Sequence, residues 1–462
     1  MSLLDNLLLN SGLEAFDDQP LAPVVSTAEA ADLAAAAEKV VELEASRDIA
    51  VANTTLATLD AELATGERAI GSATAAVNHI EQVQAGIEHF VDQGNVSAKT
   101  AMLLQRQIST VMQSVGKSGL EITSGGLESF NGCPDQLMII LSGSLEALDE
   151  EKKSAGSRAW ASVKTTLATI AKFAGEVVSQ NKRVRGEADR LAAAIKGKPE
   201  KEVSISNASL MLGKEFSKNL PTDLLKFKDK LVKAANDGIT TRSAWYFKTA
   251  PGLLAEINGA ATADVAVAAS RKFNPPALKG ASVVVKDDGD MSLKRTEVVL
   301  GNYAVFELSS KAPAPSDTAT AVASLNAIAK SRLTIQQAKA PAPEALTVKM
   351  NEATAAKIIS GVQSVLSEAD NLKGVIDSLS KQVLNLDADG KGDGDKDVRK
   401  IAAAASKLPD GLVDTVSQLP RTALRAALAV SEAALGVVSS FAGKAKKEKT
   451  DKADKPAVED KE

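Results

Sequence analysis

The sequence predicts a mainly helical protein, an elongated helical bundle with a small central α+β part that contains a short antiparallel sheet. Over long stretches, apolar residues recur at spacings of three and four, which is typical of amphipathic helices. Aromatic residues make up only 3% of the 462 residues, so alanine and the aliphatic side chains must form the core. β-Branched residues are concentrated in one central segment. Because alanine loses no side-chain entropy in a helix, we expect long, slender helices.

Changes in composition divide the chain into five expected segments. They are an N-terminal arm or propeptide (1–25), a helical region with long amphipathic helices (26–200), a mixed α+β domain with Pro-rich linkers (201–345), a C-terminal helical region (346–443) and a disordered charged tail (444–462). The tail alternates in charge and has few apolar residues to bury, so it cannot support a core.

The first helix is expected to start at Ser26, because Ser26 and Glu29 have the spacing of a reciprocal N-terminal cap, and to end near Gly66. The next helix carries one apolar stripe with the spacing of a single helical face: Ile70, Ala73, Val77, Ile80, Val83, Ile87 and Phe90. A third helix is predicted from about Ser97 to Val115.

The clearest helix is predicted to begin near Ser157 and to end at Gly197 and Pro199, since neither residue favours a continuing helix. Its apolar residues keep the same spacing from Trp160 to Ile195. Six basic residues lie on its polar face: Lys164, Lys172, Lys182, Arg183, Arg185 and Arg190. We interpret this face as a solvated surface rather than a nucleic-acid stripe, because acidic neighbours offset the charge.

Strand signals lie in the centre of the chain. Val203–Ser206 is expected to form a short strand, and Leu224–Ala235 a helix. Between Ser282 and Ser309, the strings SVVV, EVVL and YAVFEL predict antiparallel strands, with Gly289 in a turn. Two copies of KAPAP bracket a further predicted helix as stiff connectors.

The last helical region is predicted at Ala355–Leu386 and Val398–Gly443, on either side of a Gly- and Asp-rich run. Its most apolar part, Ala426–Gly443, consists mostly of Ala, Ser and Gly and contains Glu432. That composition is too weakly apolar for a membrane span, so we predict a packed helix and no membrane contact.

Charge and cysteine content limit the function classes. The formal net charge of -5 lacks the positive excess of a dedicated DNA binder. The single cysteine, Cys133, cannot form an internal disulfide, which fits a reducing cytoplasm. The first residues have no basic region before their apolar run, so export is not indicated.

Catalytic and metal-binding signatures are missing from the sequence. None of the strings GxSxG, HExxH, GxGxxG or GxxxxGK[ST] occurs. His79 and His89 are ten residues apart, which places them on different sides of one predicted helix. Cys133 has no histidine nearby in the sequence to activate it. We therefore predict no catalytic, cofactor-binding or metal-binding residue and no enzyme activity. Catalysis by a pair of carboxylates has no characteristic sequence motif, so it is the one class that these motifs do not address.

The strongest metal candidate is a cluster of five aspartates: Asp387, Asp389, Asp393, Asp395 and Asp397. Clustered carboxylates suit calcium, but the fifth position of this run is Lys391 and the twelfth is Val398, where an EF-hand loop needs oxygen ligands. We interpret the run as a flexible acidic loop.

Several short strings carry a family resemblance. Gly126–Phe130 (GLESF) and Ser144–Leu148 (SLEAL) precede a lysine-rich link and the helix that begins near Trp160, and Gly12–Phe16 (GLEAF) is a related string in the arm. This arrangement, over roughly residues 100–200 and the arm, resembles the internal head proteins of giant phages of the phiKZ type. The resemblance implies a helical protein that is packed with the genome inside the capsid.

The resemblance also implies processing, because the prohead protease of these phages cuts after a small-X-Glu tripeptide. Matching tripeptides end at four residues: Glu14, Glu38, Glu128 and Glu146. Glu14 lies in the segment most expected to be extended, whereas Glu38 lies inside a predicted helix. The alternative interpretation of all four is an ordinary glutamate on a helix surface.

The leading functional hypothesis is a non-enzymatic internal virion protein, synthesised in the host cytoplasm and located in the capsid interior. Its expected partners are other virion head proteins, the prohead protease and, weakly and without sequence preference, DNA. The alternative is a helical scaffolding or assembly protein, cellular or viral, whose amphipathic stripes pair with partner helices. A third possibility is an ejected enzyme that acts on host targets through residues 200–345. It is kept only because no sequence pattern assigns a function to those residues.

Overall fold

A computed structural model describes the following residues: 27–93, 103, 106–108, 110, 134–205, 219–288, 291–311, 314–337, 346–381, 395–408, 411–412 and 414–443. The chain forms two compact units, residues 1–54 and residues 55–462. In the first unit, the described residues 27–54 are helical throughout. The predicted arm (1–25), the charged tail (444–462) and the expected turn at Gly289 lie outside the described residues.

Helix α2 (Thr27–Gln93) is continuous, so the helix end predicted near Gly66 is wrong. Gly66 lies against helix α5 (Pro134–Ala194), and a Cβ atom at Gly66 would be 2.6 Å from Thr166 Oγ1. Glycine here permits two helices to approach closely and does not end one of them. The predicted apolar stripe of α2 is confirmed at five buried positions: Ile70, Val77, Ile80, Val83 and Ile87.

Helix α5 begins at Pro134, well before the predicted start at Ser157. The residues just before Ser157 are mostly charged, which hides the apolar spacing, but Glu and Lys are good helix formers. After the helix, Gly197 has a φ of +69°, a backbone conformation that glycine adopts without strain. The apolar stripe predicted here is buried, at Val163, Leu167, Ile170, Ala174, Val177, Val184 and Ala188 of α5 and at Ile195 just after it.

Two short strands connect the helices to the mixed region. Strand β1 (Lys201–Ile205), predicted at nearly these residues, pairs antiparallel with β6 (Leu346–Met350), and Val203 is opposite Val348. From β6 the chain passes directly into helix α12 (Glu352–Ser380), which packs against α5. The mixed region is therefore an insertion whose two ends are held together by backbone hydrogen bonds.

The mixed region contains a four-stranded antiparallel sheet in the order β2-β3-β4-β5. Its strands are β2 (Val283–Asp288), β3 (Met291–Arg295), β4 (Tyr303–Ser310) and β5 (Arg332–Gln337). Strands predicted from SVVV and YAVFEL are confirmed, but the one predicted from EVVL is not. There, Val299 forms a single bridge to Tyr303 around a tight turn, η4 (Leu300–Asn302), in which Gly301 has a φ of +70°.

The mixed region also contains helical segments, some of which contact strand β4 and others helix α12. They are α7 (Leu220–Phe227), η2 (Lys228–Val232), α8 (Lys233–Ala244), η3 (Trp245–Thr249), α9 (Ala250–Asn258), α10 (Ala263–Ser270) and α11 (Thr318–Ala329). Leu224 of α7 packs on Gly361 of α12, where an added Cβ atom would lie 3.1 Å from the leucine Cδ1. The mixed region and the long helices thus share one hydrophobic core.

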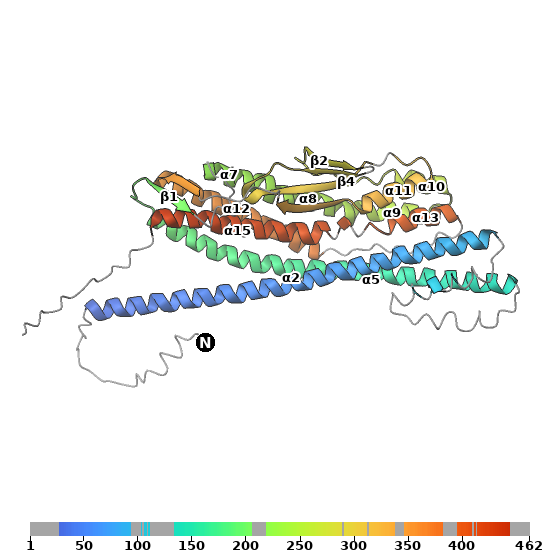
Figure 1. Cartoon of the computed structure of the whole chain (residues 1–462), viewed down its shortest axis with the longest axis horizontal. Coiled ribbons are helices and arrows are strands. Elements are labelled where there is room, and N and C mark those ends of the chain that lie inside the picture. Colours follow the sequence, from blue (N-terminus) through green and yellow to red (C-terminus); the bar gives the residue numbers. More distant parts are fainter. Residues whose placement is uncertain are drawn as a thin grey trace, which may run out of the picture. The chain divides into compact units, whose positions relative to one another are not determined.

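The C-terminal region continues with α13 (Lys396–Ala405), η5 (Asp414–Gln418) and α15 (Leu419–Ala442). Helix α5 contacts both α12 and α15, and α12 and α15 contact each other, so the three pack together over part of the length of α5 (Figure 1). By length and composition, the helix Thr415–Ala442 could cross a membrane, but 61% of its most apolar window is buried inside the fold. This burial supports the predicted packed helix. The fold is mainly α with small antiparallel sheets, as the sequence predicts.

Candidate functional site

The sequence-derived metal candidates do not come together in the part of the chain that is described. His79 and His89 are both exposed on α2. Asp395 is the N-cap of α13, where its carboxylate accepts hydrogen bonds from the backbone N–H groups of Asp397 (2.9 Å) and Ala263 (3.1 Å). Asp397 forms an ion pair with Lys400 at 2.9 Å. This end of the acidic run therefore has a structural role, the joining of α13 to α10.

Other candidate residues lie outside the described part of the chain or in regular helix. Cys133, Glu14, Glu128 and three of the five clustered aspartates are among the residues that are not described. Glu38 lies within α2 and Glu146 within α5. A protease that needs extended backbone would have to unwind a helix at these two glutamates.

The basic residues of α5 fall into two groups. Arg183 pairs with Glu432 of α15 at 2.7 Å, and Arg185 pairs with Asp370 of α12 at 2.7 Å. Burial raises the pKa of Glu432, while the charge of Arg183 acts in the opposite direction. These two arginines hold neighbouring helices together. The other four, Lys164, Lys172, Lys182 and Arg190, are exposed.

Acidic side chains of α2 meet basic side chains of α15. Arg421 lies 3.9 Å from Asp60 and 3.7 Å from Glu67, and Arg425 also pairs with Asp60. Ser417 donates a hydrogen bond from its Oγ to Glu67 at 2.7 Å. These polar contacts join α2 to α15, and Leu63 of α2 belongs to the shared hydrophobic core.

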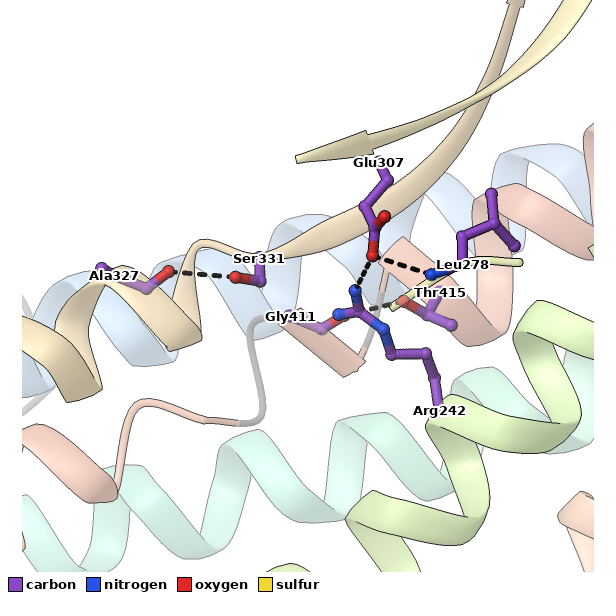
Figure 2. Close-up of polar contacts among 7 residues, drawn as sticks. All are labelled: Arg242, Leu278, Glu307, Ala327, Ser331, Gly411 and Thr415. Carbon is purple, nitrogen blue, oxygen red and sulfur yellow. Dashed lines mark hydrogen bonds and ion pairs between the residues drawn. The ribbon is translucent and has the colours of Figure 1, made fainter. Parts of the chain in front are cut away.

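The most buried charged pair is Arg242 of α8 with Glu307 of β4 (Figure 2). Each side chain is only 2% exposed, and the Arg242 Nη2 to Glu307 Oε1 distance is 2.6 Å. The same carboxylate oxygen accepts a hydrogen bond from the backbone N–H of Leu278 at 3.0 Å. Because two charges are removed from water here, their mutual attraction has to offset a large desolvation cost.

The polar cluster drawn in Figure 2 also includes two separate hydrogen bonds, each within a local turn of the chain. Thr415 Oγ1 donates to the carbonyl of Gly411 at 3.0 Å, and Ser331 Oγ donates to the carbonyl of Ala327 at 3.2 Å. Sequence reasoning missed the cluster. The one available signal is Glu307 itself, which follows directly on the apolar residues of a predicted strand. The cluster is enclosed by the fold, which suits a structural crosslink between helix and sheet better than contact with a substrate.

The family of phiKZ-like phage internal head proteins matches residues 55–440. No curated protein and no solved structure matches the sequence. The match begins within one residue of the boundary between the two compact units.

Proposed function

Because the chain belongs to the phiKZ-like phage internal head proteins, we propose that it is a non-enzymatic structural protein packed with the genome and trimmed by the prohead protease. Membership of the family makes it a structural protein of the virion head that is located in the capsid interior and associates with other head components. The family match is the observation that carries this conclusion. The lack of enzyme activity, the trimming and the packing with DNA are the proposed parts.

Charge distribution supports trimming of the N-terminal segment. Residues 1–38 contain no Lys or Arg but seven acidic residues: Asp5, Glu14, Asp17, Asp18, Glu29, Asp32 and Glu38. A chain that starts at Lys39 keeps 54 basic and 52 acidic residues, which changes the formal net charge from -5 to +2. A cut after Glu14 changes it only to -3, because two acidic residues are lost. Trimming therefore reduces repulsion between the protein and DNA phosphates.

The position of the core favours the first two candidate glutamates over the last two. In the part of the chain whose burial is described, the first buried side chain is that of Leu56. A cut after Glu14 or Glu38 leaves it in place. A cut after Glu128 or Glu146 separates α2 from the rest of the chain, although Leu56, Leu59, Leu63 and Ile70 belong to the shared core.

Mass spectrometry of purified virions with terminal peptides mapped tests the proposal. We expect the protein in the head and a mature N-terminus at Ala15 or Lys39. Peptides from residues 1–14 at the same abundance as core peptides would contradict trimming. Presence in immature particles but absence from mature virions would instead indicate a scaffolding protein.

A further inference from the structure

We propose that the outward face of α5 between Ala161 and Ala193 binds the phosphate backbone of double-stranded DNA without sequence preference. This inference rests on the proposed packing with the genome and identifies the surface that makes the contact.

The charges on this face are available for a partner. Lys164, Lys172, Lys182 and Arg190 are exposed, and none of them forms an ion pair with another residue in the described parts of the chain. By contrast, Arg183 and Arg185 are already paired with carboxylates on α15 and α12. The carboxylates that pair with these two arginines come from other helices, and in the described parts of the chain no acidic side chain of α5 forms an ion pair with the four exposed cations.

The four cations lie on one side of the helix, opposite the core. At 3.6 residues per turn, they fall within an arc of about 80°. Val163, Ile170 and Val177, which are fully buried, lie on the opposite side. With a rise of about 1.5 Å per residue, the row spans about 39 Å, slightly more than the roughly 34 Å of one turn of B-DNA.

The other residues on the same arc have small side chains: Ala168, Gly175, Ser179 and Gly186 between the cations, with Ala161 before them and Ala193 after them. At Gly175 and Gly186, no atom lies within 4 Å of the position that a Cβ atom would take. Packing within the protein therefore does not require glycine there, although each glycine costs about 0.5–1 kcal/mol relative to alanine inside a helix. Along this arc the helix surface is therefore smooth except for the four cationic side chains, so a DNA backbone can approach it closely.

The chemistry of the face favours duplex DNA over other anionic partners. It carries no aromatic side chain on which the bases of a single strand can stack. It also lacks the large apolar anchors that dominate protein interfaces. The carboxylates of Glu176, Glu187 and Asp189 lie at its margins, which limits the affinity. Point charges without base-reading groups give salt-dependent, sequence-blind binding.

The test compares three variants of the full-length chain with the wild type by fluorescence anisotropy, using a mixed-sequence DNA duplex over a range of salt concentrations. The first replaces the four cations (K164Q, K172Q, K182Q and R190Q). We expect the slope of log affinity against log salt concentration to become shallower by up to about 3.6, and the affinity at low salt to fall roughly tenfold or more. Gln retains helix propensity, so circular dichroism should be unchanged.

The matched control removes four exposed lysines of the mixed region (K230Q, K248Q, K279Q and K330Q), which changes the net charge by the same amount. We expect it to bind DNA like the wild type, as should a K164R, K172R and K182R variant. Unchanged binding by the first variant, or equal losses in the first variant and the control, would overturn the inference. Neither result affects the location and trimming of the protein, which virion proteomics measures separately.

Discussion

Replacement of Glu307 by alanine will lower the free energy of unfolding of the mixed region by about 3–5 kcal/mol, because it leaves Arg242 charged and buried without its partner. Both side chains are 2% exposed, so water cannot replace the lost carboxylate without disruption of the fold. The backbone N–H of Leu278 loses its acceptor as well. Urea unfolding can be followed by tryptophan fluorescence, since Trp245 is buried and its ring lies 4.9 Å from that of Tyr246.

Two controls separate this effect from a general loss of charge. Glu297→Ala removes an exposed carboxylate that precedes the same strand and should change stability by less than about 0.5 kcal/mol. The double replacement Arg242→Met with Glu307→Leu should lose less stability than Glu307→Ala alone, because no unpaired charge stays buried. A Glu307→Ala variant as stable as Glu297→Ala would show that the pair does not crosslink α8 and β4.

Replacement of Gly411 by alanine will destabilise the protein by about 1–3 kcal/mol, because the new methyl group has no space. A Cβ atom there would lie 2.6 Å from the backbone oxygen of Ser331 and 2.7 Å from the hydroxyl of Tyr246. A backbone oxygen cannot move aside as a flexible side chain can, so the segment before η5 has to shift. Thermal unfolding monitored by circular dichroism measures the loss.

Gly436→Ala is the matched control, since Gly436 lies in α15 with no atom within 4 Å of an added Cβ. There the same substitution should stabilise the helix by about 0.5–1 kcal/mol. Equal effects at the two positions would mean that steric fit at Gly411 does not determine stability.

The long helices could be predicted because their signal is local. Aliphatic residues at spacings of three and four mark the buried faces of α2 and α5 in the sequence alone. The errors arose where a residue has a role that depends on a distant neighbour. In the sequence, Gly66 indicates the end of a helix. In the structure, it allows close packing against Thr166, a residue 100 positions away. Strand β3 was missed because its residues, MSLKR, show little of the apolar character that marks a strand.

The polar contacts could not be predicted for the same reason. Arg242 and Glu307 are 65 residues apart, and no local pattern relates them. The six basic residues of α5 look equivalent in sequence. Their division into two paired arginines and four exposed cations depends on where Asp370 and Glu432 lie in the fold.

The antiparallel pairing of β1 with β6 has a consequence for how proteins of this architecture can diverge. The two strands are hydrogen-bonded neighbours. The segment between Ile205 and Leu346 is therefore an excursion, in which the chain leaves the helical framework at β1 and returns to the same place at β6. The entropy lost on closing such an excursion grows only with the logarithm of its length, about 0.6 kcal/mol for each doubling. Relatives can therefore gain or lose surface segments within this excursion at small thermodynamic expense, while the registration of α5 against α12 is preserved.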